Sequence, residues 1–476
     1  MAVVADAEAK AAHTPGTSPP AARIGWIMPP LVLALYALKP LGPIKDPDAF
    51  WHIVAGEHLL GTGQFVLEDP LGAATEKVWI LNQWLPEVLM HWAHTAYGLP
   101  GVAWLLCLTS LLVGVSVYAA CRRRSSALVT ALVLAVAFVA LSGSLSPRPQ
   151  LVTFALAAIT TSTWLLSRED GRARWWLVPL TWLWACSHGM WFVGPVIGGL
   201  VVAGMLLERR VSMRTAARLA VVPVLSVAVA ALTPVGPRLF TSPFQVGGVT
   251  NLISEWQPPG LTEPGLLAAL LLVAVVVVDQ VARDRGEWTV ALLTIVALVL
   301  AVTWSRTTGL AAVVLAPLAA MAIQRLTRQT VVGIPRRERV AVLVSGAVSL
   351  VLAALLAPAA TASPGLGANG LDAALSRLPA GTVVCNDQVD GGWLMLQHPG
   401  LRPTMDTRVE LYSVERIRAY LGFIAAEPGW QSYPEQVGCT YAALPADAAV
   451  VSAMRATGDW QLVEQAGGYA LLRSRG

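Results

Sequence analysis

The chain has 476 residues, of which 55% are hydrophobic and only 13% are charged, and its mean hydropathy is +0.60. Soluble domains carry about 25% charged residues, so this composition and its long uncharged runs indicate an integral membrane protein. The net charge of +4 does not indicate a nucleic-acid partner, because the arginines stand in short clusters between apolar runs. Five cysteines without a CxxC pair argue against a zinc site or a thioredoxin-like centre.

Residues 1–22 are mostly Ala, Pro, Thr and Ser and are expected to form a disordered cytoplasmic tail. The next apolar run lacks an A-x-A cleavage pattern, so we interpret it as an uncleaved first span of a transmembrane domain over residues 23–358. Because a span needs about 20 apolar residues, the sequence predicts about eleven transmembrane helices. They fall at roughly 24–41, 98–120, 126–142, 150–167, 175–188, 190–207, 217–233, 263–281, 288–304, 308–323 and 340–358.

The distribution of basic residues predicts the orientation in the membrane. Alternate loops on one side hold most of them: Arg122, Arg123, Arg124, Arg168, Arg172, Arg174, Arg209, Arg210, Arg214, Arg218, Arg283, Arg285, Arg325, Arg328, Arg336, Arg337 and Arg339. The opposite loops hold only Lys45, Lys77, Arg148, Arg238 and Arg306. Since cytoplasmic loops are rich in Lys and Arg, we predict a multi-pass plasma-membrane protein with a cytoplasmic N-terminus and an extracytoplasmic C-terminal domain.

Two predicted outer loops are unusually long. The first, 42–97, is far longer than a turn, and long structured loops are usually functional. Its stretches 48–60 and 84–97 have helical periodicity, which predicts helices in the outer interface with four tryptophans at headgroup level: Trp51, Trp79, Trp84 and Trp92. The second loop, 233–260, is rich in Pro and Gly and contains Glu255-Trp256.

A linker over 359–370 precedes a more polar region, 371–476, which is predicted to be an extracytoplasmic α/β domain. Strands are expected at 382–387, 439–444 and 469–473, and helices near 371–378, 413–426 and 446–457. Its two cysteines, Cys385 and Cys439, are predicted to face an oxidising compartment. The sequence leaves open whether these cysteines form a disulfide or are free thiols, because it does not show whether the two lie close together.

Polar residues gather at the predicted outer ends of the spans. They are Asp46, Asp48, His52, Glu57, Asp69, Arg148, His188, Arg238, Glu255 and Arg306. All of them except Glu57 and Asp69 form the candidate site. Charges beside membrane segments are costly and tend to face protein cavities. A carboxylate can take a proton from an acceptor hydroxyl, and an arginine can stabilise a departing phosphate. This combination therefore suits chemistry on a lipid-linked phosphate.

Each of these residues also has a structural interpretation. Asp48 fits the start of the following helix, and Asp46 before Pro47 fits a turn. Arg148 and Arg306 fit interfacial anchors, and His188 fits a buried structural histidine.

Other polar groups are weaker candidates. Glu87, His91 and His94 share one helical face at a spacing that suits a metal, but three polar residues on an interfacial helix are commoner, so we assign no metal ligands. In the C-terminal domain, a sugar-binding role and a structural role both stay open for Asp387, Asp406, Arg408 and Glu410. The sequence contains no phosphate-binding glycine-rich loop, HExxH or GxSxG motif.

Several short motifs in a fixed order resemble a known family. They are Asp46-Pro-Asp-Ala-Phe-Trp-His52, Glu68-Asp-Pro70, Arg148-Pro-Gln150, Ser187-His-Gly189, Pro234-Val-Gly236, Glu255-Trp256 and Met405-Asp-Thr-Arg-Val-Glu-Leu-Tyr412. Together they resemble bacterial multispanning proteins related to the GT-C glycosyltransferases, including the family 39 mannosyltransferase-like branch. The resemblance covers nearly all of the chain except the N-terminal tail.

The resemblance implies a glycosyltransferase that uses a polyprenyl-phosphate sugar and an extracytoplasmic glycan, lipid or protein acceptor at the membrane. In such enzymes an acidic residue of the first outer loop is the base or a metal ligand, which implies Asp48 first and Asp46 second. Arg148 and Arg306 become candidates for the donor phosphate, and transfer is expected to invert the anomeric centre. No cofactor follows from the sequence, and a divalent cation stays open. Asn82-Gln83-Trp84-Leu85 stands where relatives often have His-Glu-Trp-Leu, which argues against a catalytic role there.

Two other functions stay open. A transporter or flippase of a lipid-linked glycan predicts charges in the middle of the spans and an internal repeat, whereas the charges here cluster at span ends. A non-catalytic cell-envelope assembly protein predicts that replacing Asp46 and Asp48 changes little.

Overall fold

The fold was analysed in a computed structural model. It describes residues 25–241, 254–283, 286–328, 331, 333–363 and 365–475. The predicted tail, 1–22, and residues 242–253 of the second predicted outer loop lie outside these ranges.

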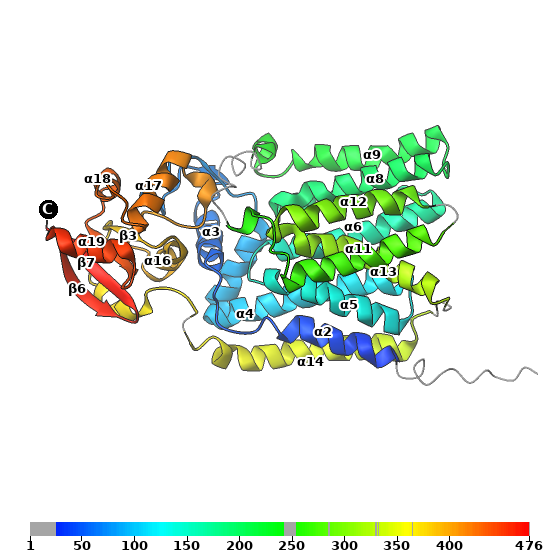
Figure 1. Cartoon of the computed structure of the whole chain (residues 1–476), viewed down its shortest axis with the longest axis horizontal. Helices are drawn as coiled ribbons and strands as arrows, with labels where there is room; N and C mark the ends of the chain where they lie inside the picture. Colours follow the sequence, from blue (N-terminus) through cyan, green and yellow to red (C-terminus); the bar gives the residue numbers. More distant parts are fainter. Residues whose placement is uncertain are drawn as a thin grey trace, which may run out of the picture.

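Roughly parallel helices form a bundle, and a smaller domain covers one end of it (Figure 1). The bundle helices are α2 (Met28–Leu38), α4 (Trp84–Arg122), α5 (Ala127–Leu141), α6 (Gln150–Asp170), α7 (Leu177–Ala185), α8 (Val193–Leu207), α9 (Met213–Ala230), α11 (Pro264–Val281), α12 (Trp288–Thr303), α13 (Thr308–Leu326) and α14 (Arg336–Ala360). Among the described residues, eight helical segments are long and apolar enough to cross a membrane, and Gly25–Leu38 and Trp288–Thr303 are shorter apolar helices. The bundle therefore follows the predicted spans closely.

Helix α13 lies at the centre of the bundle and α14 at its edge. In their most apolar stretches, 78% of α13 residues but only 22% of α14 residues are buried by protein. A buried ion pair fastens α14 to α4, because Arg122 donates to both carboxylate oxygens of Glu338 at 2.7 and 2.9 Å. Leu343 and Leu355 of α14 are exposed, as expected for a helix facing lipid.

The fifth predicted span, 175–188, is wrong as a full transmembrane helix. Only nine residues, Leu177–Ala185, are helical, and at about 1.5 Å per residue they cannot cross a hydrocarbon core of about 30 Å. The predicted stretch 84–97 and the following span are joined in one helix, α4, which bends at Gly98 (φ 64°) just before Pro100.

Helix α3 (Asp48–Thr62) lies between the bundle and the C-terminal domain, where it crosses the direction of the bundle helices (Figure 1). The prediction that Trp51 of α3 and Trp79 of the first loop lie at headgroup level is wrong, because they are 5% and 2% exposed and pack against protein. Trp92, in contrast, is 55% exposed on α4. Hydrophobic periodicity alone does not distinguish a face that meets lipid from one that meets another domain.

The C-terminal domain is an α/β unit around one five-stranded sheet. The strands are β3 (Val383–Asn386), β4 (Arg402–Pro403), β5 (Tyr441–Pro445), β6 (Trp460–Ala466) and β7 (Tyr469–Ser474), in the order β4-β3-β5-β7-β6. Strand β3 pairs in parallel with β4 and β5, and β7 pairs antiparallel with β5 and β6. The helices are α15 (Asp372–Leu375), α16 (Gly391–Gln397), α17 (Val414–Ile424), α18 (Ser432–Val437) and α19 (Ala449–Thr457). A small hairpin of β1 (Val66–Leu67) and β2 (Trp79–Ile80) belongs to the first loop.

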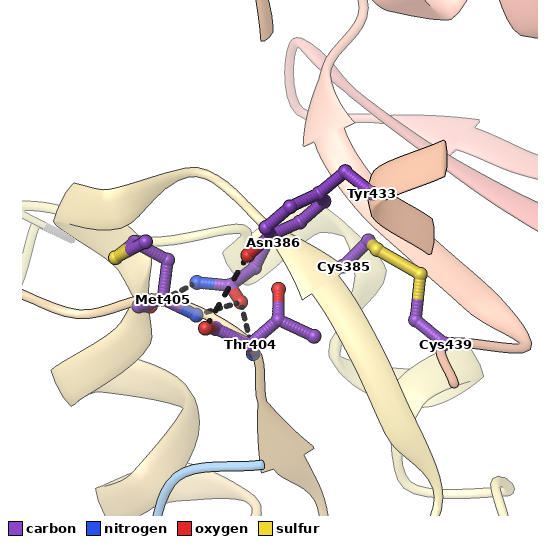
Figure 2. Close-up of a disulfide and its surroundings, with 6 residues drawn as sticks. All are labelled: Cys385, Asn386, Thr404, Met405, Tyr433 and Cys439. Atoms are coloured by element: carbon purple, nitrogen blue, oxygen red, sulfur yellow. Dashed lines mark hydrogen bonds between the residues drawn. A yellow bond between two sulfur atoms is a disulfide. The ribbon is translucent and has the colours of Figure 1, made fainter. Parts of the chain in front are cut away.

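A disulfide between Cys385 and Cys439 joins β3 to the segment before β5 (Figure 2). The next residue, Asn386, is fully buried and holds the segment that follows β4. Its amide donates to the Met405 carbonyl at 2.7 Å and accepts from the Thr404 N–H at 2.9 Å (Figure 2). This anchor fixes the start of the segment 404–412, which faces the helical bundle.

The first loop and the C-terminal domain are held together by a buried charge cluster. Arg408 is fully buried and donates to both oxygens of Asp69 at 2.9 and 3.0 Å, and to Asp406 at 3.0 and 2.8 Å. Its guanidinium carbon lies 4.5 Å from the ring centre of Trp79, and the Tyr412 hydroxyl donates to Asp406 at 2.8 Å. Asp406 and Arg408 therefore have a structural role at the domain junction.

Candidate active site

Three carboxylates, two from neighbouring positions and one from a distant part of the sequence, converge on Arg148 at the end of the bundle that carries the C-terminal domain. Arg148 Nε lies 2.6 Å from Asp46 Oδ2, and Nη1 lies 3.2 Å from Asp48 Oδ2 and 2.8 Å from Glu255 Oε1. The Arg148 side chain is 11% exposed. Burial alone would lower the pKa of this guanidinium, but the three carboxylates outweigh burial and raise it.

Asp46 and Asp48 are positioned by the start of α3. Asp46 Oδ1 accepts a hydrogen bond from the Asp48 N–H at 3.0 Å, which is the turn expected before the helix. Asp48 Oδ1 accepts from Trp51 Nε1 at 3.2 Å and from the Thr407 hydroxyl. The second oxygen, Oδ2, therefore faces Arg148 while Oδ1 is held by α3 and the C-terminal domain.

Two adjacent glycines allow the C-terminal domain to approach this helix start closely. A Cβ atom at Gly392 would lie 2.8 Å from the Pro47 carbonyl oxygen, and one at Gly391 would lie 2.2 Å from the Met405 carbonyl oxygen. Both distances are too short for any side chain to fit. Helix α16 can therefore pack on α3 only because Gly392 carries no Cβ, and Gly391 allows α16 to lie against the Met405 segment of its own domain.

Glu255 links Arg148 to Arg306. Its Oε2 lies 3.3 Å from Arg306 Nη1, while its main-chain carbonyl accepts from the Ser305 hydroxyl at 3.0 Å. The Arg306 guanidinium stands 5.8 Å from the ring centre of Trp256, which contacts Trp304 edge to face. Arg306 and Glu255 are 24% and 40% exposed, so this side of the cluster is the more accessible one.

The two candidate histidines lie beside this cluster and have other partners. His52 is 2% exposed and its Nδ1 lies 3.0 Å from Glu87 Oε1. Burial lowers the pKa of His52, and its hydrogen bond to the Glu87 carboxylate only partly opposes this effect. His188 Nδ1 lies 2.9 Å from the Thr153 hydroxyl. Both histidines therefore have structural contacts of their own.

Arg238 is exposed on the short helix Gly236–Phe240 and forms no ion pair with the other candidate residues that the structure describes. Thr407, in contrast, is a site residue that the sequence did not reveal, whereas Asp69, one of the polar residues predicted at the outer face, lies at the junction with the C-terminal domain. Thr407 stands in the motif 405–412, but a threonine beside charged residues gave no signal of its own.

Divalent cations need several oxygen ligands at about 2.0–2.6 Å around one point. Here the guanidinium of Arg148 occupies the point on which Asp46, Asp48 and Glu255 converge, and it directly engages one oxygen of each aspartate and both oxygens of Glu255. Glu87, which shares a helical face with His91 and His94, is paired with His52. The described residues in this arrangement do not fit a divalent cation.

No family model matches the chain. No curated protein sequence matches it either.

Two solved structures are similar to the chain in fold. One is the apo crystal structure of an oligosaccharyltransferase from Archaeoglobus fulgidus, with 12% identity, a TM-score of 0.54, and coverage of 89% of this chain and 69% of that one. The other is ArnT from Cupriavidus metallidurans bound to undecaprenyl phosphate, with 16% identity, a TM-score of 0.48, and coverage of 94% and 98%. The chain is therefore a helical membrane protein with a GT-C-like fold and a C-terminal α/β domain.

Proposed function

We propose that the protein is a membrane glycosyltransferase that transfers a sugar from a polyprenyl-phosphate donor to an acceptor outside the cytoplasm. The observation that carries this proposal is the cluster of Asp46, Asp48 and Glu255 around Arg148, with Arg306 at its accessible side. It lies at one end of a GT-C-like bundle, under the C-terminal domain. Because fold alone does not fix activity, the cluster is the basis of the argument.

Asp48 is proposed as the general base. Its Oδ1 is held by Trp51 and Thr407, so the carboxylate has a fixed direction. Among the residues that the structure describes, Oδ2 contacts Arg148 alone, at 3.2 Å. A carboxylate oxygen can accept two hydrogen bonds, so Oδ2 keeps a lone pair for an acceptor hydroxyl. Asp46, which bonds both Arg148 and the Asp48 N–H, is proposed to position these two groups.

The transfer step follows from this geometry. The acceptor oxygen forms a bond to the anomeric carbon from the side opposite the phosphate, and its proton passes to Asp48. The bond between the anomeric carbon and the phosphate oxygen breaks, and its electron pair stays on that oxygen. Arg306 is proposed to bind the phosphate with its remaining N–H groups, and Arg148 Nη2, which has no partner among the described residues, can contribute a further donor. Inversion at the anomeric carbon is the expected outcome.

The proposal is tested with the full-length protein in lipid nanodiscs and a panel of radiolabelled polyprenyl-phosphate sugars with glycan, lipid and protein acceptors. Wild type should transfer, and Asp48→Asn should lose about 10²–10⁴-fold, as expected for removal of a general base. Asp46→Asn should lose less. Glu57→Gln is the matched control, because Glu57 is an exposed carboxylate on the same helix, α3.

Three outcomes separate the alternatives. Transfer that persists in a folded Asp48→Asn protein would keep the enzyme class but remove Asp48 as the base. Movement of the labelled lipid between leaflets without transfer would indicate a transporter or flippase. Neither binding nor transfer across the panel would leave an assembly role, for which the carboxylate variants should behave like wild type.

A further inference from the structure

Arg148 is enclosed by the kind of ligand set that proteins use for divalent cations. Asp46 and Asp48 come from the start of α3, Glu255 comes from the segment before α11, and Arg148 comes from the loop between α5 and α6. The three carboxylates reach the guanidinium at 2.6, 3.2 and 2.8 Å. Three acidic groups from two separate segments would repel one another without a cation among them.

The charges show how strongly the carboxylates depend on this side chain. The three carboxylates and the two arginines, Arg148 and Arg306, sum to one negative charge. Removing Arg148 alone leaves two negative charges in a space where the Asp46 and Asp48 side chains are only 9% and 13% exposed. Arg306 cannot replace it, because it contacts Glu255 alone among the three carboxylates.

We propose that the Arg148 guanidinium is the permanent cation of this carboxylate site, in the position that a divalent metal ion would otherwise occupy, so that the site works without a divalent metal. This inference deepens the proposed function and rests on it for the role in transfer. A guanidinium holds carboxylates in fixed directions by paired N–H bonds, and it needs no exchange with solvent ions. Its charge also lies beside the place where negative charge develops on the leaving phosphate.

The first test measures metal binding directly and does not depend on activity. Full-length protein in nanodiscs is titrated with Mn²⁺ and binding is followed by electron paramagnetic resonance. Wild type should bind no stoichiometric Mn²⁺ at this site. Arg148→Met should acquire one Mn²⁺ per chain with at least tenfold higher affinity, because three carboxylates then converge on an uncharged space.

Two further variants separate position from net charge. Arg306→Met removes the same charge from the same cluster but leaves Arg148 in place, so it should not acquire the Mn²⁺ site. Arg148→Lys keeps a cation near the carboxylates and should also exclude Mn²⁺. If Arg306→Met binds Mn²⁺ as well as Arg148→Met does, general negative charge explains the binding and the proposal is wrong.

The second test uses transfer by the wild-type protein. Activity should be unchanged, within twofold, after treatment with EDTA and after addition of Mg²⁺ or Mn²⁺. Loss of transfer in EDTA that a divalent ion restores, or stoichiometric Mn²⁺ bound to wild type, would overturn the proposal. If no donor in the panel supports transfer, the proposed function fails, while the Mn²⁺ titrations still decide whether Arg148 holds the cation position.

Discussion

The hydroxyl of Thr407 donates a hydrogen bond to Asp48 across 359 positions of sequence. Thr407 belongs to the C-terminal domain, and Asp48 is the first residue of α3. Trp51 Nε1 donates to both residues, at 3.1 Å to the Thr407 oxygen and 3.2 Å to Asp48. The C-terminal domain therefore helps to set the direction of the proposed base and is more than a cover over the bundle.

Replacing Thr407 should weaken transfer through Asp48. Thr407→Val keeps the shape but removes the donor, and a hydrogen bond to a charged group contributes about 1.5–3 kcal/mol, which corresponds to a loss of about 10- to 100-fold in kcat. Thr407→Ser retains the hydroxyl and should recover most of the activity. The measurement is the kcat and the pH profile of transfer in nanodiscs.

A merely structural role of Thr407 would give a different pattern. In that case Thr407→Val would lower the unfolding temperature and leave the pH profile of the folded fraction unchanged. A shift in the pH profile that Thr407→Ser reverses is expected only if the hydroxyl acts through Asp48.

Arg408 should be essential for the junction between the first loop and the C-terminal domain. Its side chain and that of Asp69 are both fully buried. Arg408→Met leaves the carboxylates of Asp69 and Asp406 without their cation, which should lower the free energy of unfolding by about 3–5 kcal/mol. Thermal unfolding of the full chain in nanodiscs, followed by tryptophan fluorescence, measures this change.

A nearby ion pair provides the matched control for Arg408. Arg416 and Glu76 also join the C-terminal domain to the first loop, at 3.0 Å, but they are 19% and 35% exposed. Arg416→Met should therefore cost only about 0–1 kcal/mol. Equal effects of the two variants would contradict the assignment of the junction to Arg408.

The Asp69 ion pair also predicts a loss of stability in acid. Burial would raise the pKa of Asp69, but Arg408 and the neighbouring N–H groups lower it below its ordinary value of 3.8. A carboxyl whose folded pKa is depressed stabilises the fold above its unfolded pKa, and this contribution is lost as the pH falls through the folded value. Wild type should therefore lose stability below about pH 4, and Asp69→Asn should remove that part of the loss.

The disulfide should stabilise the C-terminal domain. Cys385 and Cys439 are 54 positions apart and both are buried. Replacing both by Ala should lower the free energy of unfolding of this domain by about 2–5 kcal/mol, because the unfolded chain gains freedom. Proteolysis of the full chain with and without a reductant measures the effect. The same change in a variant that lacks both cysteines would show that the effect of the reductant does not come from this disulfide.

Long apolar segments made most of the bundle predictable, whereas short or half-polar elements were missed. The run 308–323 predicted α13 closely, because apolar segments of this length have few alternatives to a membrane helix. Strand β6 was missed although Trp460–Ala466 alternates between half-buried and exposed residues and is followed by Gly467-Gly468. Both glycines have positive φ, which is the signal of a two-residue hairpin turn.

The candidate site was predictable as a set of residues but not as a geometry. Chain order placed Asp46, Asp48, Arg148 and Arg306 at one predicted membrane face, and the structure brings them to one end of the bundle. The docking of the C-terminal domain could not be predicted, since an apolar helix face such as that of α3 fits lipid and protein equally well. The contact of Thr407 with Asp48 depends on that docking.

A buried carboxyl group in the C-terminal domain predicts a second pH dependence, of opposite sign to that of Asp69. Asp390 is 1% exposed, its Oδ1 accepts from the Tyr469 hydroxyl at 3.2 Å, and its Oδ2 is buried without a hydrogen-bond partner among the described residues. Burial raises the pKa of Asp390 to about 7. The folded state therefore favours the neutral carboxyl group.

The sign of this effect is fixed by the two pKa values of Asp390. Below the unfolded pKa of 3.8 the carboxyl group is protonated in both states, and its contribution to stability is fully present. This contribution is lost progressively as the pH rises through the folded pKa of about 7. Asp390→Asn removes the ionisation, so the variant should be more stable than wild type at pH 8, by up to about 4 kcal/mol, and nearly equal to it at pH 4. Asp447→Asn, at an exposed position of the same domain, is the control and should follow wild type. Chemical unfolding between pH 4 and 8 measures the difference. Parallel curves for wild type and Asp390→Asn would show that the folded pKa of Asp390 is not raised, because water or a rearranged side chain reaches its buried oxygen.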